Sequence, residues 1–183
     1  NALWNAVFGA YDAMFRGAIF NYKATSFTLM IKPITETLAY ATPITMAGLG
    51  LAVAFRSGLF NIGATGQMLA GAMTGLWVGF AFQLPAVLHV PLALLAAGVG
   101  GALFGAIPGV LKARTGAHEV ITTIMLNGIA SFTVLWVLKT EPFKRPGRDD
   151  AISKFTEESA RLPKLFGFLG DRIDLLAHTG FLV

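Results

Sequence analysis

The feature that most constrains this chain is a long stretch almost without charge. Residues 37–111 contain one formally charged side chain, Arg56, and one histidine, His89. A water-soluble domain of that length needs polar residues at helical or strand spacing to cover its surface, whereas the hydrocarbon core of a bilayer needs none. The mean hydropathy of the chain, +0.65, points the same way. The stretch therefore predicts membrane-spanning helices.

The apolar region, extended to residue 138, divides into four segments that are each long enough to cross a bilayer as a helix. We place them at residues 36–55, 64–82, 90–111 and 120–138. The expected fold is all-α: a polytopic transmembrane helix bundle with a four-span core at residues 36–138, inside a single transmembrane domain over residues 1–183.

Residues 1–35 are apolar but interrupted by charge. Large side chains recur there at steps of three and four residues, as on one face of a helix: Leu3, Trp4, Val7, Phe8, Tyr11, Phe15 and Ile19. A spanning helix would not carry Asp12 and Arg16 at mid-length without partners. We expect an amphipathic helix that lies in the membrane interface. A short soluble helix packed on a neighbour fits the pattern equally well.

The charges that the apolar region lacks gather further along the chain. Residues 139–174 hold eight basic and seven acidic side chains, so we expect a polar loop over residues 139–175. Within it, the segment ISKFTEESARL predicts a short amphipathic helix. Residues 176–183 are apolar again and resemble the start of a further span, and the first residue is Asn rather than Met. We therefore expect a chain cut at both ends.

Two of the predicted spans carry glycines at regular spacing. The rows are Gly71, Gly75 and Gly79 in one span and Gly101, Gly105 and Gly109 in the other. A spacing of four puts small side chains on one helix face, where another backbone can approach closely. Membrane helices are rich in glycine in any case, but two rows of three favour helix-packing seams.

Residues 56–67, RSGLFNIGATGQ, place polar side chains and three glycines between two predicted spans. If the helices are broken at membrane depth, free backbone groups must face protein or a water-filled cavity, where they can bind a substrate. The candidate residues for such a path are Phe60, Asn61, Gly63, Thr65 and Gln67. A plain loop at the membrane surface explains the spacing as well.

Asn127 is the other polar side chain of interest within a predicted span. Thr123 lies four residues earlier, on the same helix face. Asn127 either forms a helix–helix hydrogen bond or faces the same substrate path. The pattern does not separate the two.

Motifs for catalysis, metal binding and cofactor binding are absent from the sequence. The three histidines, His89, His118 and His178, lack metal-ligand spacing, and there is no cysteine. No phosphate-binding glycine motif occurs, so we expect no ATP site in this chain. The charges are too unevenly placed to indicate nucleic-acid binding. We predict no catalytic residue, no metal and no cofactor.

Two motifs together resemble a known family. The segment AFRSGLFNIG with the following GQ, and KARTGAHEVITTIMLN about fifty residues later, are similar to the permease subunits of bacterial ABC importers for branched-chain amino acids, simple sugars and nucleosides. The likeness is closest to the purine-nucleoside (guanosine-type) branch and covers roughly residues 34–138.

The resemblance implies a transport subunit of the bacterial cytoplasmic membrane rather than an enzyme. Such a permease moves nucleosides or simple sugars by alternating access. The implied partners are a second permease subunit, cytoplasmic ATP-binding subunits that hydrolyse ATP, an extracytoplasmic substrate-binding protein or lipoprotein, and membrane lipid. Our hypothesis for Phe60 is that it stacks on a nucleobase, and ordinary lipid-facing bulk is an equal alternative. The family usually has Glu at the position of Thr65, so any role of that carboxylate is in doubt here.

Orientation is a point of conflict. The resemblance implies that residues 1–35 and 139–174 lie outside the cell, whereas the count of basic residues favours a cytoplasmic 139–174 loop. We follow the resemblance, because the absent spans also carry charges that set topology.

Two alternatives remain: a structural or assembly subunit of a membrane enzyme complex, and an ion-coupled secondary transporter. The latter normally places acidic residues inside its spans, and residues 37–111 have none.

Overall fold

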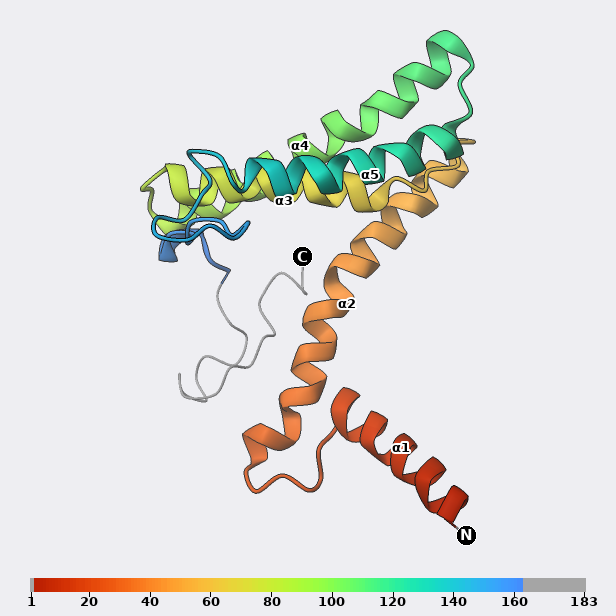
Figure 1. Cartoon of the computed structure of the whole chain (residues 1–183), viewed down its shortest axis with the longest axis vertical. Coiled ribbons are helices and arrows are strands. Elements are labelled where there is room, and N and C mark those ends of the chain that lie inside the picture. The colour runs from red at the N-terminus through yellow and green to blue at the C-terminus, as the bar shows by residue number, and fades with distance from the viewer. Residues whose placement is uncertain (1, 163–183) are drawn as a thin grey trace. The chain divides into compact units, whose positions relative to one another are not determined.

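The computed structural model describes residues 2–162, and within them all regular structure except one isolated bridge between Lys144 and Ser153 is helical (Figure 1). The helices are α1 (Ala2–Ala18), α2 (Phe27–Arg56), α3 (Ala64–Ala81), α4 (Ala86–Thr115), α5 (Glu119–Val137) and the short 3-10 helix η1 (Glu158–Ala160). The all-α prediction is therefore confirmed. The further span expected at residues 176–183 and His178 lie outside the described residues.

Three of these helices are long and apolar enough to cross a membrane by length and composition: α2, α4 and α5. They correspond to three of the four predicted spans. The fourth, at residues 64–82, is the 18-residue helix α3, which is not among these three. That α3 also crosses the membrane stays a prediction.

The helix ends differ from the predicted ones mainly in α2 and α4. Helix α2 begins at Phe27 and contains Pro33 and Pro43. Helix α4 begins directly after Pro85 and ends at Gly116, which adopts a left-handed conformation with φ 69° and returns its N–H to the carbonyl of Lys112 at 3.0 Å. Glycine adopts that conformation without steric cost and so ends a helix well.

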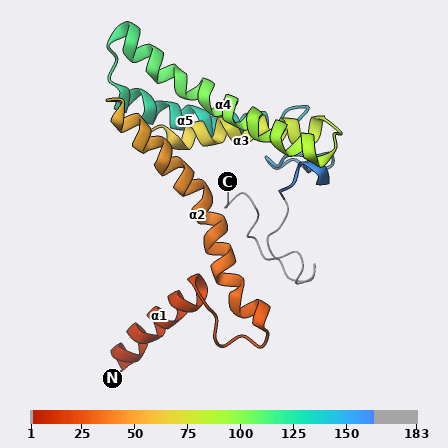
Figure 2. The same ribbon diagram turned by 180° about the vertical axis from the view of Figure 1, so that it is seen from behind.

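The described chain forms two compact units, residues 2–48 and residues 49–161. In the first unit, α1 leads through a short turn into α2 (Figure 2). Asp12 accepts hydrogen bonds from Arg16 Nε and Lys23 Nζ, both at 2.9 Å, and from the Tyr22 hydroxyl. The Tyr22 hydroxyl first, and then the two cations, lower the pKa of Asp12 from 3.8 to about 2. The charges within α1 are thus partnered.

The apolar face of α1 is exposed, with Leu3 at 82% and Trp4 at 64% of full exposure. This agrees with an amphipathic helix whose apolar face is to be covered by lipid or by another protein. Its place in the membrane interface stays a prediction.

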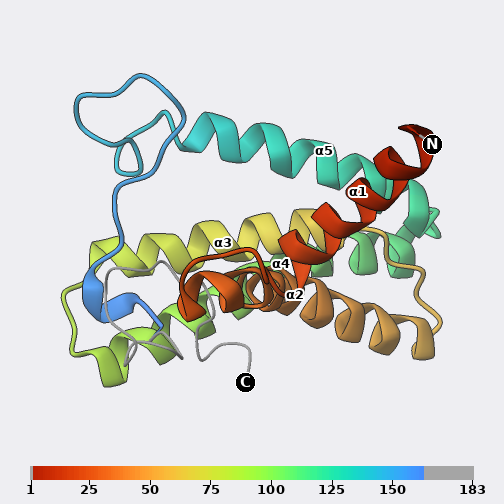
Figure 3. The same ribbon diagram turned by 90° about the horizontal axis from the view of Figure 1, so that it is seen from below.

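In the second unit, α3 lies between α4 and α5 (Figure 3). The link between α3 and α4 is short, and the two helices run antiparallel along a glycine-rich seam. A Cβ added to Gly71 would lie 2.7 Å from the Ala97 carbonyl oxygen, and one added to Gly75 would lie 3.2 Å from that of Ala93. Such contacts leave no room for a larger side chain, so glycine allows the close backbone approach.

The other glycines of the two rows differ in what they face. Gly101 and Gly105 face Gln67 across the α3–α4 seam. A Cβ added to Gly79 would instead lie 3.0 Å from Thr156 of the following loop, and one added to Gly109 would meet nothing within 4 Å in the described part of the chain. The seam therefore uses the glycines from the middle of the two helices and not those at one end of each row.

The loop after α5 packs on the end of the α3–α4 pair. Buried His89 contacts the Ser159 hydroxyl at 2.7 Å through Nδ1 and the Val78 carbonyl at 3.1 Å through Nε2. Because a carbonyl only accepts, Nε2 carries the proton. Phe143 packs edge-on against Phe80, with ring centroids 5.3 Å apart.

The predicted amphipathic helix over ISKFTEESARL is wrong, since only Glu158–Ala160 is helical. The backbone of this segment pairs elsewhere. Lys154 N–H donates to the Phe143 carbonyl at 2.9 Å, and Glu157 N–H donates to the Gly79 carbonyl at 2.8 Å. These tertiary hydrogen bonds replace the i to i−4 bonds that a helix would need.

Candidate functional site

The candidate site is the non-helical connector between α2 and α3, residues 57–63. Helix α2 ends because Gly58 takes a left-handed conformation, φ 72°, and Leu59 N–H turns back to the Ala54 carbonyl at 2.9 Å. From there to α3 the backbone lacks helical partners. Its polar groups must be satisfied by other parts of the protein or by water.

Side chains from α4 and α5 supply those partners. Lys112 Nζ donates to the Gly58 carbonyl at 3.3 Å, and Phe60 N–H donates to Glu119 Oε1 at 2.7 Å. Asn127 donates from Nδ2 to the Ile62 carbonyl at 2.9 Å and accepts the Gly66 N–H on Oδ1 at 2.8 Å. Three side chains thus fix the connector from its start to the first turn of α3.

The connector also stabilises itself around Gly63. Asn61 Oδ1 accepts the Gly63 N–H at 2.7 Å, which closes an Asx turn. Gly63 is buried, and a Cβ added to it would lie 3.2 Å from Thr123 Cβ. Thr123 is 2% exposed and directs its hydroxyl to the Glu119 carbonyl at 2.8 Å. A Cβ at position 63 would therefore crowd both Thr123 of α5 and the Asn61 side-chain oxygen.

The charged pair next to the connector joins the ends of two helices. Lys112 in the last turn of α4 forms an ion pair with Glu119, the first residue of α5. Each charge has the sign that its helix end favours, since acids stabilise helix N-termini and bases C-termini. The Glu119 side chain is only 16% exposed, so its carboxylate is held between Lys112 and the Phe60 amide.

The remaining candidates lie around this network. The Phe60 ring is 50% exposed and packs on Phe55, with centroids 5.1 Å apart. Thr65 is exposed on the first turn of α3, whereas Gln67 is half-buried beside Gly105. The structure thus brings Phe60, Asn61, Gly63 and Asn127 together and leaves Thr65 and Gln67 on α3.

A small cavity of about 60 Å³ adjoins the connector. Its lining includes Phe60, Asn61, Glu119 and Thr123. This volume holds a few water molecules but no nucleoside or sugar. Among the described residues, no group of His, Asp or Glu side chains can hold a metal ion.

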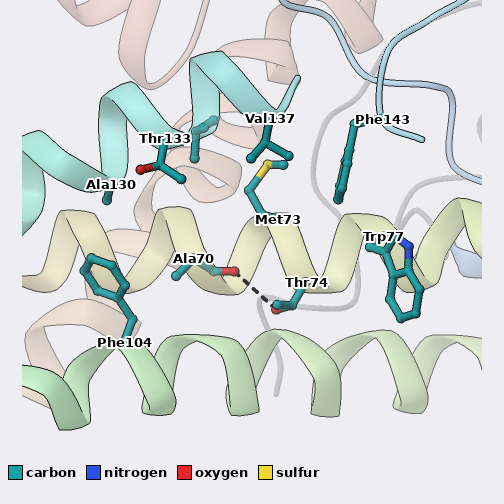
Figure 4. Close-up of a pocket in the computed structure, with 10 residues that line it drawn as sticks. Ala70, Met73, Thr74, Trp77, Phe104, Ala130, Thr133, Val137 and Phe143 are labelled. Atoms are coloured by element: carbon teal, nitrogen blue, oxygen red, sulfur yellow. Dashed lines mark hydrogen bonds between the residues drawn. The ribbon is translucent and has the colours of Figure 1, made fainter. Parts of the chain in front are cut away.

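A larger cavity of about 380 Å³ lies between α3 and α5, with Phe104 of α4 and Phe143 of the loop at its edges (Figure 4). Its polar groups are the hydroxyls of Thr74 and Thr133 and the indole N–H of Trp77. The Thr74 hydroxyl already donates to the Ala96 carbonyl, 2.8 Å away. The hydroxyl groups of a hydrophilic substrate would lack hydrogen-bond partners in this cavity, so the cavity suits an apolar occupant.

Sequence reasoning missed Glu119 and Lys112. Glu119 is the only acidic residue between residues 37 and 138, which is the signal that could have singled it out. The spacing of Thr123 and Asn127 did place both on one helix face. The contact of that face with the connector, across 65 residues between Asn127 and Ile62, has no trace in the local pattern.

Comparison with known proteins identifies the family. Residues 34–181 match the family described as the permease component of the branched-chain amino acid transport system. The chain belongs to this permease family. As a permease chain with three helices long and apolar enough to cross a bilayer, it is part of a multi-pass protein of the cytoplasmic membrane.

Three permeases named for a cargo are similar to this chain in sequence. The guanosine ABC transporter permease NupP of Bacillus subtilis is 46% identical over 130 residues, 71% of this chain and 32% of that protein. A glucose ABC transporter permease of Haloferax volcanii is 39% identical over 154 residues, 82% of this chain and 40% of that protein. The nucleoside ABC transporter permease NupB of Lactococcus lactis is 46% identical over 102 residues, 55% of this chain and 28% of that protein.

The matched part of the permease chain spans about a third of the length of these relatives. No solved structure matches the chain.

Proposed function

We propose that this chain is part of the transmembrane permease of an ATP-driven importer that moves nucleosides, with simple sugars as the second candidate cargo. Relatives named for guanosine, nucleosides and glucose support this proposal, and NupP and NupB are 46% identical to the chain against 39% for the glucose permease. The observation that carries it in the structure is the connector, a non-helical polar segment that α4 and α5 bind through side chains.

The proposed partners follow from the family. A second permease subunit completes the membrane path, cytoplasmic subunits bind and hydrolyse ATP, and an extracytoplasmic protein delivers the substrate. The permease itself breaks no bond. It converts closure of the ATP-binding subunits into alternating access, so the transport step depends on the helices around the path.

In this proposal the connector lines the path. The polar groups of Asn61 and Asn127 are bound to backbone and hold its shape. The half-exposed Phe60 ring and the exposed Thr65 then remain to contact the substrate. An aromatic ring in this position suits a nucleobase, since stacking on a base contributes about 1–3 kcal/mol.

Transport in proteoliposomes tests the proposal. The full-length permease with its ATP-binding and substrate-delivery partners should accumulate labelled guanosine when ATP is supplied, and glucose poorly. Preference for glucose would make the second cargo the correct one. Accumulation of neither, with a correctly assembled complex, would refute the importer.

A pair of variants tests the path. Phe60→Leu should lower guanosine uptake about tenfold, as expected from losing one stacking contact. Phe132→Leu is the matched control, because Phe132 lies 76% exposed on α5, away from the connector, and should transport normally. Asn61→Leu, which removes the acceptor of the Gly63 amide, should abolish uptake while the protein still reaches the membrane. Normal uptake by Phe60→Leu and Asn61→Leu together removes the connector from the path.

A further inference from the structure

Glu119 lies where three elements meet: the end of α4, the start of α5 and the middle of the connector. One carboxylate oxygen accepts the Phe60 N–H at 2.7 Å, and the other pairs with Lys112. Lys112 in turn reaches the Gly58 carbonyl at 3.3 Å. The two side chains therefore bind the connector at alternate residues, one through a carbonyl and one through an amide.

We infer that Glu119 is a positioning residue, which sets the place of Phe60 by binding its backbone amide, with Lys112 holding the carboxylate in register. The consequence for transport rests on the proposed function above; the positioning itself does not.

The geometry makes this contact hard to replace. The Phe60 amide lies outside any helix, so without Glu119 it loses its protein acceptor. A hydrogen bond to a charged acceptor is stronger than one to a neutral group. The carboxylate is also mostly shielded from water, which strengthens its interaction with Lys112.

The arrangement also links two distant turns. Glu119 and Lys112 flank the turn between α4 and α5, which bends at Gly116. A displacement of this turn must carry the Glu119 carboxylate with it and, through the Phe60 amide, the connector. Because the Phe60 ring rests on Phe55, the same displacement reaches the last turn of α2. The pair is thus placed to transmit movement of the α4–α5 turn to the candidate path.

Thiol labelling tests the positioning directly, because the chain has no cysteine. In the purified full-length complex, freed of other cysteines, Leu59→Cys places a thiol beside Phe60. We expect Glu119→Ala to raise the rate at which a polar maleimide labels this thiol about tenfold, since the connector loses a charge-assisted hydrogen bond. Glu119→Gln keeps an acceptor oxygen but loses the charge, so its labelling rate should lie between those of the parent protein and Glu119→Ala.

Two controls make the result specific. Asp149→Cys, in the loop after α5, should label at the same rate whichever residue stands at position 119. Glu158→Ala, which removes an acid from another helix start, should leave labelling at Leu59→Cys unchanged. Unchanged labelling in Glu119→Ala, or equal acceleration in Glu119→Gln and Glu119→Ala, would overturn the inference.

Uptake then separates the inference from the proposed function. If Glu119 positions the path through Phe60, Glu119→Ala should lower guanosine uptake about tenfold, and Glu119→Gln should restore part of it. Changed labelling with normal uptake would leave the contact real but overturn its role in transport. Failure of the parent complex to transport any nucleoside or sugar would refute the proposed function and leave the labelling result standing.

Discussion

The Asn127 side-chain oxygen accepts the backbone N–H of Gly66 at 2.8 Å, although 61 residues separate the two in sequence. The same amide group donates to the Ile62 carbonyl at 2.9 Å. One side chain of α5 therefore binds both the last part of the connector and the first turn of α3. It uses its amide N–H as a donor to one and its amide oxygen as an acceptor for the other.

Asn127→Leu should destabilise the protein, because it leaves the Ile62 carbonyl and the Gly66 amide without these partners. Gly66 is buried, and an unsatisfied buried group costs about 1–3 kcal/mol, so the unfolding temperature of the detergent-solubilised permease should fall clearly. Ser131→Ala is the matched control: Ser131 is exposed one turn later on α5 and donates only to the Asn127 carbonyl of its own helix. An unfolding temperature that falls equally in both variants would show that the connector contact is not the cause.

The glycine seam predicts a sharp contrast between two substitutions to alanine. Gly71→Ala would place a Cβ 2.7 Å from the Ala97 carbonyl oxygen, so α3 and α4 must separate and the protein should lose about 1–3 kcal/mol of stability. Gly98→Ala, within α4, meets nothing within 4 Å and should be neutral or stabilising by up to about 1 kcal/mol. Thermal unfolding of both variants in the same detergent checks the sign of each change.

The contrast also shows what the glycine spacing could and could not predict. Residues four apart on a helix share a face, so the pattern correctly indicates which glycines can act together. It does not say what faces them. Gly79 meets Thr156 of a loop, and Gly109 meets nothing in the described structure, because the partners depend on tertiary arrangement.

The helices themselves follow from the sequence because long apolar segments bounded by polar turns leave few other structures in a membrane. The connector network does not. Glu119 and Phe60 lie 59 residues apart, and the local sequence around either residue does not indicate the other as its partner. The helix prediction for the loop after α5 was wrong for a related reason. The backbone N–H groups of Glu157 and Lys154 bind the carbonyls of Gly79 and Phe143, and these hydrogen bonds outweigh the amphipathic pattern.

The Asp12 cluster predicts a pH dependence of the first unit. Its folded pKa is lowered from 3.8 to about 2, chiefly by the Tyr22 hydroxyl. A depressed pKa means that the carboxylate stabilises the folded state above pH 3.8 and that this contribution is lost as the pH falls through about 2. Asp12→Asn should therefore be less stable than the parent protein at pH 6, and the difference should shrink below pH 4 and vanish near pH 2. A difference independent of pH would contradict the assignment.

Thr65 supports a final prediction. It is exposed in the first turn of α3, which contains no acidic residue, and the preceding Gly63 offers no side-chain cap. A carboxylate there would interact favourably with the free N–H groups of the helix start, so Thr65→Glu should raise stability by about 0.3–1 kcal/mol. Thr115→Glu is the opposite control, because it adds the same charge at the end of α4, where it should lower stability. If Thr65→Glu also changes the rate of guanosine uptake while Thr115→Glu does not, position 65 contacts the path; if stability changes alone, its charge acts only on the helix.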